Sequence, residues 1–71
     1  MISDEIIKQI IAGTDHVCRI VTEDEVYEGF VYGPVSEYDS YCGHDAIDIS
    51  TDEEFDLEVD ATTIKSIEII E

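Results

Sequence analysis

Residues 46–60, AIDISTDEEFDLEVD, alternate apolar and polar side chains on both sides of an acidic run. Alternation with a period of two places the apolar side chains of a strand on one face and the polar ones on the other. Residues 51–54 are expected to turn between two such strands. The apolar side chains expected to face the core are Ile47, Ile49, Phe55, Leu57 and Val59. Two antiparallel strands with an acidic outer face are therefore predicted.

Another pair of strands is expected upstream. Residues 16–22 and 26–32 are rich in β-branched and aromatic side chains and are separated by a short acidic turn. Gly29, inside the second of these runs, predicts a sharp bend or a bulge. Gly33 and Pro34 are expected to end that strand, and residues 35–45 have the composition of a long loop.

A short helix is expected before the first strand, over about residues 3–12. Ser3 is a plausible N-cap, two acids follow it in the first turn, and Gly13 is expected to stop the helix. Isoleucines recur three and four residues apart, as on a stripe that faces a core. They are Ile2, Ile6, Ile7, Ile10 and Ile11.

The C-terminal part of the sequence predicts a tight connection followed by a last strand. Residues 60–63 are expected to make the connection, and residues 64–70 the strand, with Ile67 and Ile69 facing inward. The predicted fold is thus mainly β, a single domain over residues 1–71. A five-stranded antiparallel sheet this short is expected to curl into a small barrel over about residues 15–70, with the helix covering one open end.

The predicted helix, the turn, strand and bend of residues 22–29, and the closing strand at residues 64–68 resemble the Sm-like small β-barrel, which is close to the SH3-like barrel. The RNA-binding members of that family have an asparagine in their base-binding loop, and this chain contains no Asn. Their Arg-Gly signature before the last strand is replaced here by residues 60–63. In size, element order and charge the chain is similar to acidic Sm-like inhibitors of the transcription termination factor Rho. That resemblance implies a protein that presents acids to a nucleic-acid-binding partner.

The charge of the chain excludes several classes of partner. Nineteen Asp and Glu stand against three Lys and Arg, giving a formal charge of −16, while the 44% hydrophobic content is that of a folded domain. So few basic side chains cannot replace the counterions of a nucleic acid, and an anionic membrane repels such a protein. Neither a membrane-spanning run nor a signal peptide is recognised, so a cytoplasmic location is expected.

The acids are concentrated where basic residues are missing. No Lys or Arg lies between Arg19 and Lys65. Same-face neighbours on a strand lie about 6.6 to 7 Å apart, near the spacing of phosphates along a nucleic acid strand. The acids expected to bind a basic protein partner are Asp48, Asp52, Glu53, Glu54, Asp56, Glu58 and Asp60. Two tyrosines of the predicted loop, Tyr38 and Tyr41, are expected to join them, and Tyr32 lies just before that loop. The alternative is that the acids only keep the surface soluble and protect sheet edges.

Two mirrored pairs, His16 with Cys18 and Cys42 with His44, are the only candidates for a metal site. Together they offer two thiolates and two imidazoles, a donor set that suits Zn²⁺, although their spacing is unlike that of zinc ribbons or knuckles. Acidic surroundings would also weaken either cysteine as a nucleophile, so neither enzyme activity nor a cofactor is expected. A zinc-binding module and an oligomeric structural protein without RNA binding remain as alternative functions.

Overall fold

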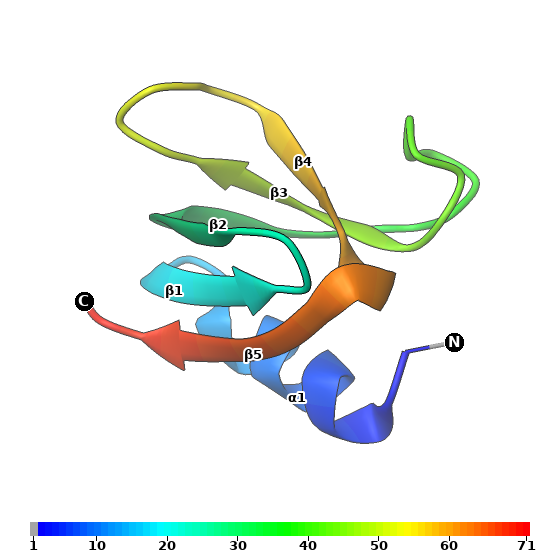
Figure 1. Cartoon of the computed structure of the whole chain (residues 1–71), viewed down its shortest axis with the longest axis horizontal. Coiled ribbons are helices and arrows are strands. Elements are labelled where there is room, and N and C mark those ends of the chain that lie inside the picture. The colour runs from blue at the N-terminus through cyan, green and yellow to red at the C-terminus, as the bar shows by residue number, and fades with distance from the viewer. Residues whose placement is uncertain (1) are drawn as a thin grey trace.

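A computed structural model describes residues 2–71 and contains one helix and five strands (Figure 1). In chain order the elements are α1 (Asp4–Gly13), β1 (Val17–Thr22), β2 (Val26–Val35), β3 (Ala46–Ser50), β4 (Leu57–Asp60), the single-turn η1 (Ala61–Thr63) and β5 (Ile64–Ile69). Every strand pairing is antiparallel, in the order β4-β3-β2-β1-β5. The predicted mainly β class with an N-terminal helix is confirmed. Within residues 2–71, no helix has the length and apolar character needed to cross a bilayer.

The sheet is open and strongly curved. Its two edge strands, β4 and β5, are joined only by η1, so the two edges approach each other at that end of the sheet (Figure 1). Among the described residues these strands form no ladder with each other. Much of the curvature comes from β2, since Val26 to Phe30 pairs with β1 whereas Phe30 to Val35 pairs with β3.

Gly29 lies where β2 changes partners. A Cβ atom at this position would lie 2.9 Å from the carbonyl carbon of Ser50, closer still to its oxygen, and 3.2 Å from Cα of Thr51. Only a residue without a side chain therefore allows the end of β3 to approach β2 so closely. The expected bulge is not at Gly29, whose pairing with β1 is regular. It lies between Val31 and Gly33 in the pairing with β3.

The prediction that Gly33 and Pro34 end the second strand is wrong. β2 continues to Val35, and Pro34 pairs with Ile47 of β3. β1 pairs with β2 only as far as Phe30, so Pro34 has a strand on one side alone, where a missing N–H group is tolerated.

The core lies on the concave face of the sheet and under α1. Its buried members are Ile6, Ile10, Cys18, Ile20, Val31, Ile47, Ile49, Val59, Ala61 and Ile64, and four partly buried side chains pack against them: Ile2, Tyr27, Leu57 and Ile67. The inward orientation predicted for Ile47, Ile49 and Val59 is confirmed. A short chain can bury only a small core, so each of these side chains contributes a large share of its stability.

Two apolar residues predicted to belong to the core are exposed. Phe55 is 80% exposed, because β4 begins only at Leu57 and the intervening Asp56 has a left-handed backbone with φ of 54°. Ile69 is also exposed. Its direction is nevertheless that of Ile67, because the β1 partners of these two residues, Cys18 and Ile20, are both buried. The bulge at Lys65 precedes both isoleucines and does not separate them, so Ile69 has the predicted orientation but is not covered.

The predicted helix start is confirmed in detail. Oγ of Ser3 accepts a hydrogen bond from the backbone N–H of Ile6 at 3.2 Å, so Ser3 is the N-cap. The helix ends at Gly13. Thr14 closes it by donating from its hydroxyl to the carbonyl of Ile10 at 2.9 Å and from its N–H to the carbonyl of Ile11 at 3.3 Å.

The isoleucine stripe of α1 is only partly core. α1 packs against β5 and β2 through Ile6 and Ile10, whereas Ile7 is half-exposed and Ile11 is 64% exposed (Figure 1). Only part of the isoleucine stripe therefore contacts the sheet, and Ile7 and Ile11 lie beside this contact. One polar contact fixes the helix there, because Oε1 of Gln9 accepts a hydrogen bond at 2.8 Å from an amide of β5.

Candidate acidic binding cleft

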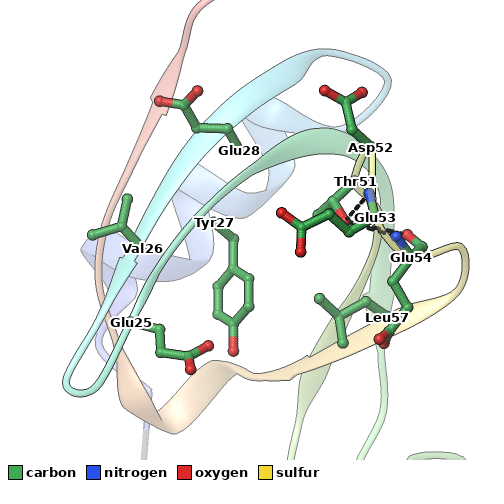
Figure 2. A pocket seen from close by; sticks show the side chains of 9 residues that line it. All are labelled: Glu25, Val26, Tyr27, Glu28, Thr51, Asp52, Glu53, Glu54 and Leu57. Carbon is green, nitrogen blue, oxygen red and sulfur yellow. Dashed lines mark hydrogen bonds between the residues drawn. The ribbon is translucent and has the colours of Figure 1, made fainter.

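A cleft of about 640 Å³ opens where β3 leaves β2 (Figure 2). The two strands pair no further than Phe30 with Ser50, so the chain after Ser50 diverges from the first half of β2. The residues that line the space between them, called here the acidic cleft, are Glu25, Val26, Tyr27, Glu28, Thr51, Asp52, Glu53, Glu54 and Leu57. Five of these nine side chains are carboxylates.

One wall of the acidic cleft begins at the turn between β1 and β2. The hydroxyl of Thr22 accepts hydrogen bonds from the backbone N–H groups of Asp24 at 3.3 Å and Glu25 at 3.0 Å. The N–H of Thr22 donates to the carbonyl of Glu25 at 2.9 Å. The turn is thus held by one threonine and the backbone, as in turns nucleated by a hydroxyl side chain. The side chain of Glu25 is left free to enter the cleft.

The opposite wall is formed by a second turn of the same construction. The hydroxyl of Thr51 accepts hydrogen bonds from the N–H groups of Glu53 at 3.3 Å and Glu54 at 3.1 Å. The N–H of Thr51 donates to the carbonyl of Glu54 at 2.9 Å. In both turns a threonine is followed by three acids, and no carboxylate takes part in these turn hydrogen bonds. The three acids predicted at the tip of this hairpin, Asp52, Glu53 and Glu54, all line the cleft.

An aromatic ring lies between one carboxylate of each turn. Figure 2 shows Tyr27 between Glu25 and Glu53, with Leu57 across from it. The Glu25 carboxylate beside its hydroxyl is the main cause that raises the pKa of Tyr27, followed by partial burial and the negative charges of its neighbours, Glu54 among them. Tyr27 therefore stays protonated, and its ring offers a face on which a cation can rest.

No basic side chain lines the acidic cleft among the described residues. The nearest cation along β1 is Arg19, whose Nε donates to Oε2 of Glu28 at 2.8 Å. Both partners are about half exposed, so this pair adds little stability but occupies the one arginine of the chain. The arrangement suits a lysine or arginine side chain supplied from outside, which would gain carboxylate acceptors on two walls and an aromatic face between them.

The acids predicted on the outer face of β3 and β4 are brought together only in part. Asp48 and Glu58 are direct cross-strand partners, whereas Asp56 lies before β4 in the left-handed conformation described above. Partial burial, then the charges of Glu58 and Asp56, raise the pKa of Asp48. Like charges directly opposite each other on a sheet repel, so this face stores unfavourable energy that a cation would relieve.

Two of the predicted binding acids already have partners. The carboxylate of Glu58 accepts hydrogen bonds from the backbone N–H of Tyr41, at 3.0 and 2.8 Å, and so anchors the loop of residues 36–45. Oδ1 of Asp60 accepts from the N–H of Thr62 at 2.9 Å and from its hydroxyl at 2.6 Å, which caps η1. These acids contribute to the fold, and their charge is less free for a partner than that of the cleft acids.

The tyrosines of the loop project into solvent. Tyr38 is 89% exposed and Tyr41 is 99% exposed, so neither ring packs over the sheet. Tyr32 is half-exposed and meets Phe30 edge to face, with ring centroids 5.1 Å apart. Tyr38 and Tyr41 are therefore available to a partner, although they do not line the acidic cleft.

The mirrored His and Cys pairs do not form a metal site. Cys18 is fully buried beside the end of α1, where its thiol donates to the carbonyl of Gly13 at 3.4 Å, and burial raises its pKa. Cys42 is exposed in the loop, with contacts to Ser40 and His44 only. In residues 2–71 no three His, Cys, Asp or Glu side chains are grouped so as to hold a metal ion.

The carboxylates of β2 and its turn, Glu25 and Glu28, were not singled out by sequence reasoning, and neither was Tyr27. A signal was present, because residues 22–25 and 51–54 have the same pattern of one threonine and three acids. Antiparallel order along the chain places both turns at the same end of the sheet. No protein-family model, curated protein or solved structure matches the chain.

Proposed function

We propose that this chain is a small non-enzymatic interaction protein of the cytoplasm that binds a basic protein surface through its acidic cleft. The observation that supports this most directly is that four carboxylates from two turns, together with Glu28 of β2, line one cleft whose lining contains no basic side chain among the described residues. A surface that is only soluble normally mixes both signs of charge. Here the acids are gathered around Tyr27 and Leu57, whose apolar surfaces give a bound side chain something to pack against.

The partner we propose is a nucleic-acid-binding protein whose basic site the acids occupy in place of phosphates. The acids gathered at the two turns and the absence of Lys and Arg between Arg19 and Lys65 support this proposal. Opposed charges of this density also speed association at low salt, so binding should weaken steeply as salt is added.

The finer fold assignment belongs to the same proposal. Strong curvature, the division of β2 between two partner strands and the link of both sheet edges through η1 support a small barrel of the Sm-like or SH3-like type. The lack of Asn and of an Arg-Gly pair before β5 favours a member that does not bind RNA.

The test compares two variants with the same change in net charge. Glu53→Gln with Glu54→Gln removes two carboxylates from the cleft, whereas Asp4→Asn with Glu5→Gln removes two from the exposed first turn of α1. Binding of a lysine-rich synthetic peptide is measured by calorimetry at several salt concentrations. The cleft variant should bind about threefold to tenfold more weakly than the wild type, and the helix variant should bind nearly as well.

Equal weakening in both variants would mean that the peptide responds only to total charge, and the cleft would lose its role. Affinity that does not change with salt would contradict the electrostatic basis of the proposal. Charge reversal at Glu58 or Asp60 is a poorer test, because those carboxylates also hold the loop and η1 in place.

An oligomeric structural role is a second candidate. The observation that favours it is that β4 and β5 each have a strand on one side only. Exposed edges can pair between copies, although Gln9 already accepts the amide hydrogen of Ile67 on β5. Native mass spectrometry of the purified chain tests this role, since a monomer at all concentrations would contradict it.

A further inference from the structure

A second hollow, of about 540 Å³, adjoins the acidic cleft and shares Glu28, Thr51 and Asp52 with it. It lies on the outer face of the sheet, away from the core. Four apolar side chains contribute to its lining: Val17, Phe30, Phe55 and Ile70. These four residues are called here the apolar hollow.

The side chains of the apolar hollow are open to solvent and do not belong to the core. Val17 and Phe30 are cross-strand partners on β1 and β2, so they form a continuous floor. Phe55 is 80% exposed beside this floor, because the left-handed Asp56 turns it away from the core. Burying a phenylalanine side chain is favourable, and this position leaves that gain unused in the free protein. Polar and charged groups share this lining with the four apolar side chains, so a bound segment would meet both kinds of surface there.

The negative charge around the apolar hollow limits which kinds of partner can bind over it. Its rim carries Glu28, Asp52 and Glu71, and the only guanidinium nearby, that of Arg19, is bound to Glu28. A second copy of this chain would bring the same carboxylates against each other, which is unfavourable. An anionic lipid surface would be repelled in the same way. A basic peptide segment is the occupant whose charge is complementary.

We infer that the apolar hollow receives an apolar side chain of the same basic segment whose lysine or arginine enters the acidic cleft. This inference rests on the proposed function and specifies its ligand: a segment in which a large apolar residue is a neighbour of basic ones. Charge brings the segment to the surface, and the apolar contact adds affinity that salt does not remove.

Two lysine-rich peptides that differ only in a central Phe or Ser test the inference. The wild-type protein should bind the Phe peptide about tenfold more tightly than the Ser peptide, and this ratio should persist at high salt. Phe55→Ser should abolish the ratio while leaving affinity for the Ser peptide unchanged. Ile11→Ser, which replaces an exposed apolar residue on α1, should keep the ratio.

A second readout uses the unmodified protein. In NMR spectra, the methyl signals of Val17 and Ile70 should shift when the Phe peptide is added, and much less with the Ser peptide. Equal affinity for both peptides would overturn the apolar contact and leave the acidic cleft standing. Failure of both peptides to bind at low salt would overturn the proposed function itself. A ratio that survives Phe55→Ser would place the apolar contact elsewhere and refute this inference.

Discussion

Gly29→Ala should destabilise the protein more than a Gly→Ala substitution at the other glycine of the sheet, Gly33. The added Cβ would lie 2.9 Å from the carbonyl carbon of Ser50 and 3.2 Å from Cα of Thr51, where ordinary contacts are 3.4–4 Å. Both atoms belong to the backbone, so neither can move aside by a change of rotamer. β2 and the end of β3 must separate instead.

The cost of that separation is of the kind seen when a packed core is overfilled, about 3 kcal/mol. Folded domains have about 0.05–0.15 kcal/mol of stability per residue, so such a loss removes a large part of the total for a chain of this size. The corresponding fall in Tm is about 12–24 °C. The acidic cleft should widen as well, because Thr51 and Asp52 follow directly on the displaced Ser50.

Urea denaturation followed by circular dichroism measures the effect, with Gly43→Ala as the matched control. Gly43 has a left-handed φ of 81° and no atom within 4 Å of its Cβ position, so alanine there should lose only about 1 kcal/mol of backbone preference. Gly29 has no positive φ, and its cost is therefore steric. If Gly29→Ala were no worse than Gly43→Ala, the close crossing of β2 and β3 would be refuted.

Two aspartates should show opposite dependence of stability on pH, measured by urea denaturation from neutral to acid pH. Because burial, Glu58 and Asp56 raise the pKa of Asp48, its contribution is fully present below the ordinary value of 3.8 and is lost as pH rises through the raised value. Asp48→Asn should thus stabilise the protein by about 0.5 kcal/mol at neutral pH and by little in acid. Partial burial acts to raise the pKa of Asp60, but the hydrogen bonds from Thr62 and a nearby histidine outweigh it and lower the pKa. Its contribution is present above 3.8 and lost as pH falls through the lowered value, so Asp60→Ala should cost about 1 kcal/mol at neutral pH and less in acid.

Local patterns predicted the fold wherever the chain is regular. Ile47 and Ile49 alternate as expected because β3 is paired on both sides and runs without a bulge through its pairing with β4. One error falls where a single residue departs from the pattern, because Asp56 adopts a left-handed backbone before β4 begins and Phe55 is left exposed. The other concerns Ile69, which shares the core-facing register of Ile67 but is exposed. Alternation along a strand predicts the direction of a side chain and does not predict whether another element covers it.

The sequence predicted one wall of the candidate site and missed the other, because the second wall depends on a contact between distant residues. The acids of residues 52–54 are visible as a run at a hairpin tip. Their convergence with Glu25 and Glu28 depends on where β3 leaves β2, and that point is fixed by the contact between Gly29 and Ser50. A contact between residues 21 positions apart along the chain (50 − 29) leaves no trace in local periodicity. The sequence singled out Gly29 for a bend or a bulge, but it did not reveal that the end of β3 would approach this residue.

The turns at residues 22–25 and 51–54 have the same construction, in which the threonine closes the turn and the acids carry the charge. The hydrogen bonds that close these turns use only threonine hydroxyls and the backbone, so neither turn needs the carboxylates that follow its threonine. Replacing the side chain of Glu53 or Asp24 should therefore leave both hairpins intact, whereas replacing Thr22 or Thr51 should loosen them. The charge of this surface can thus be changed residue by residue while the two threonines keep the shape of the cleft.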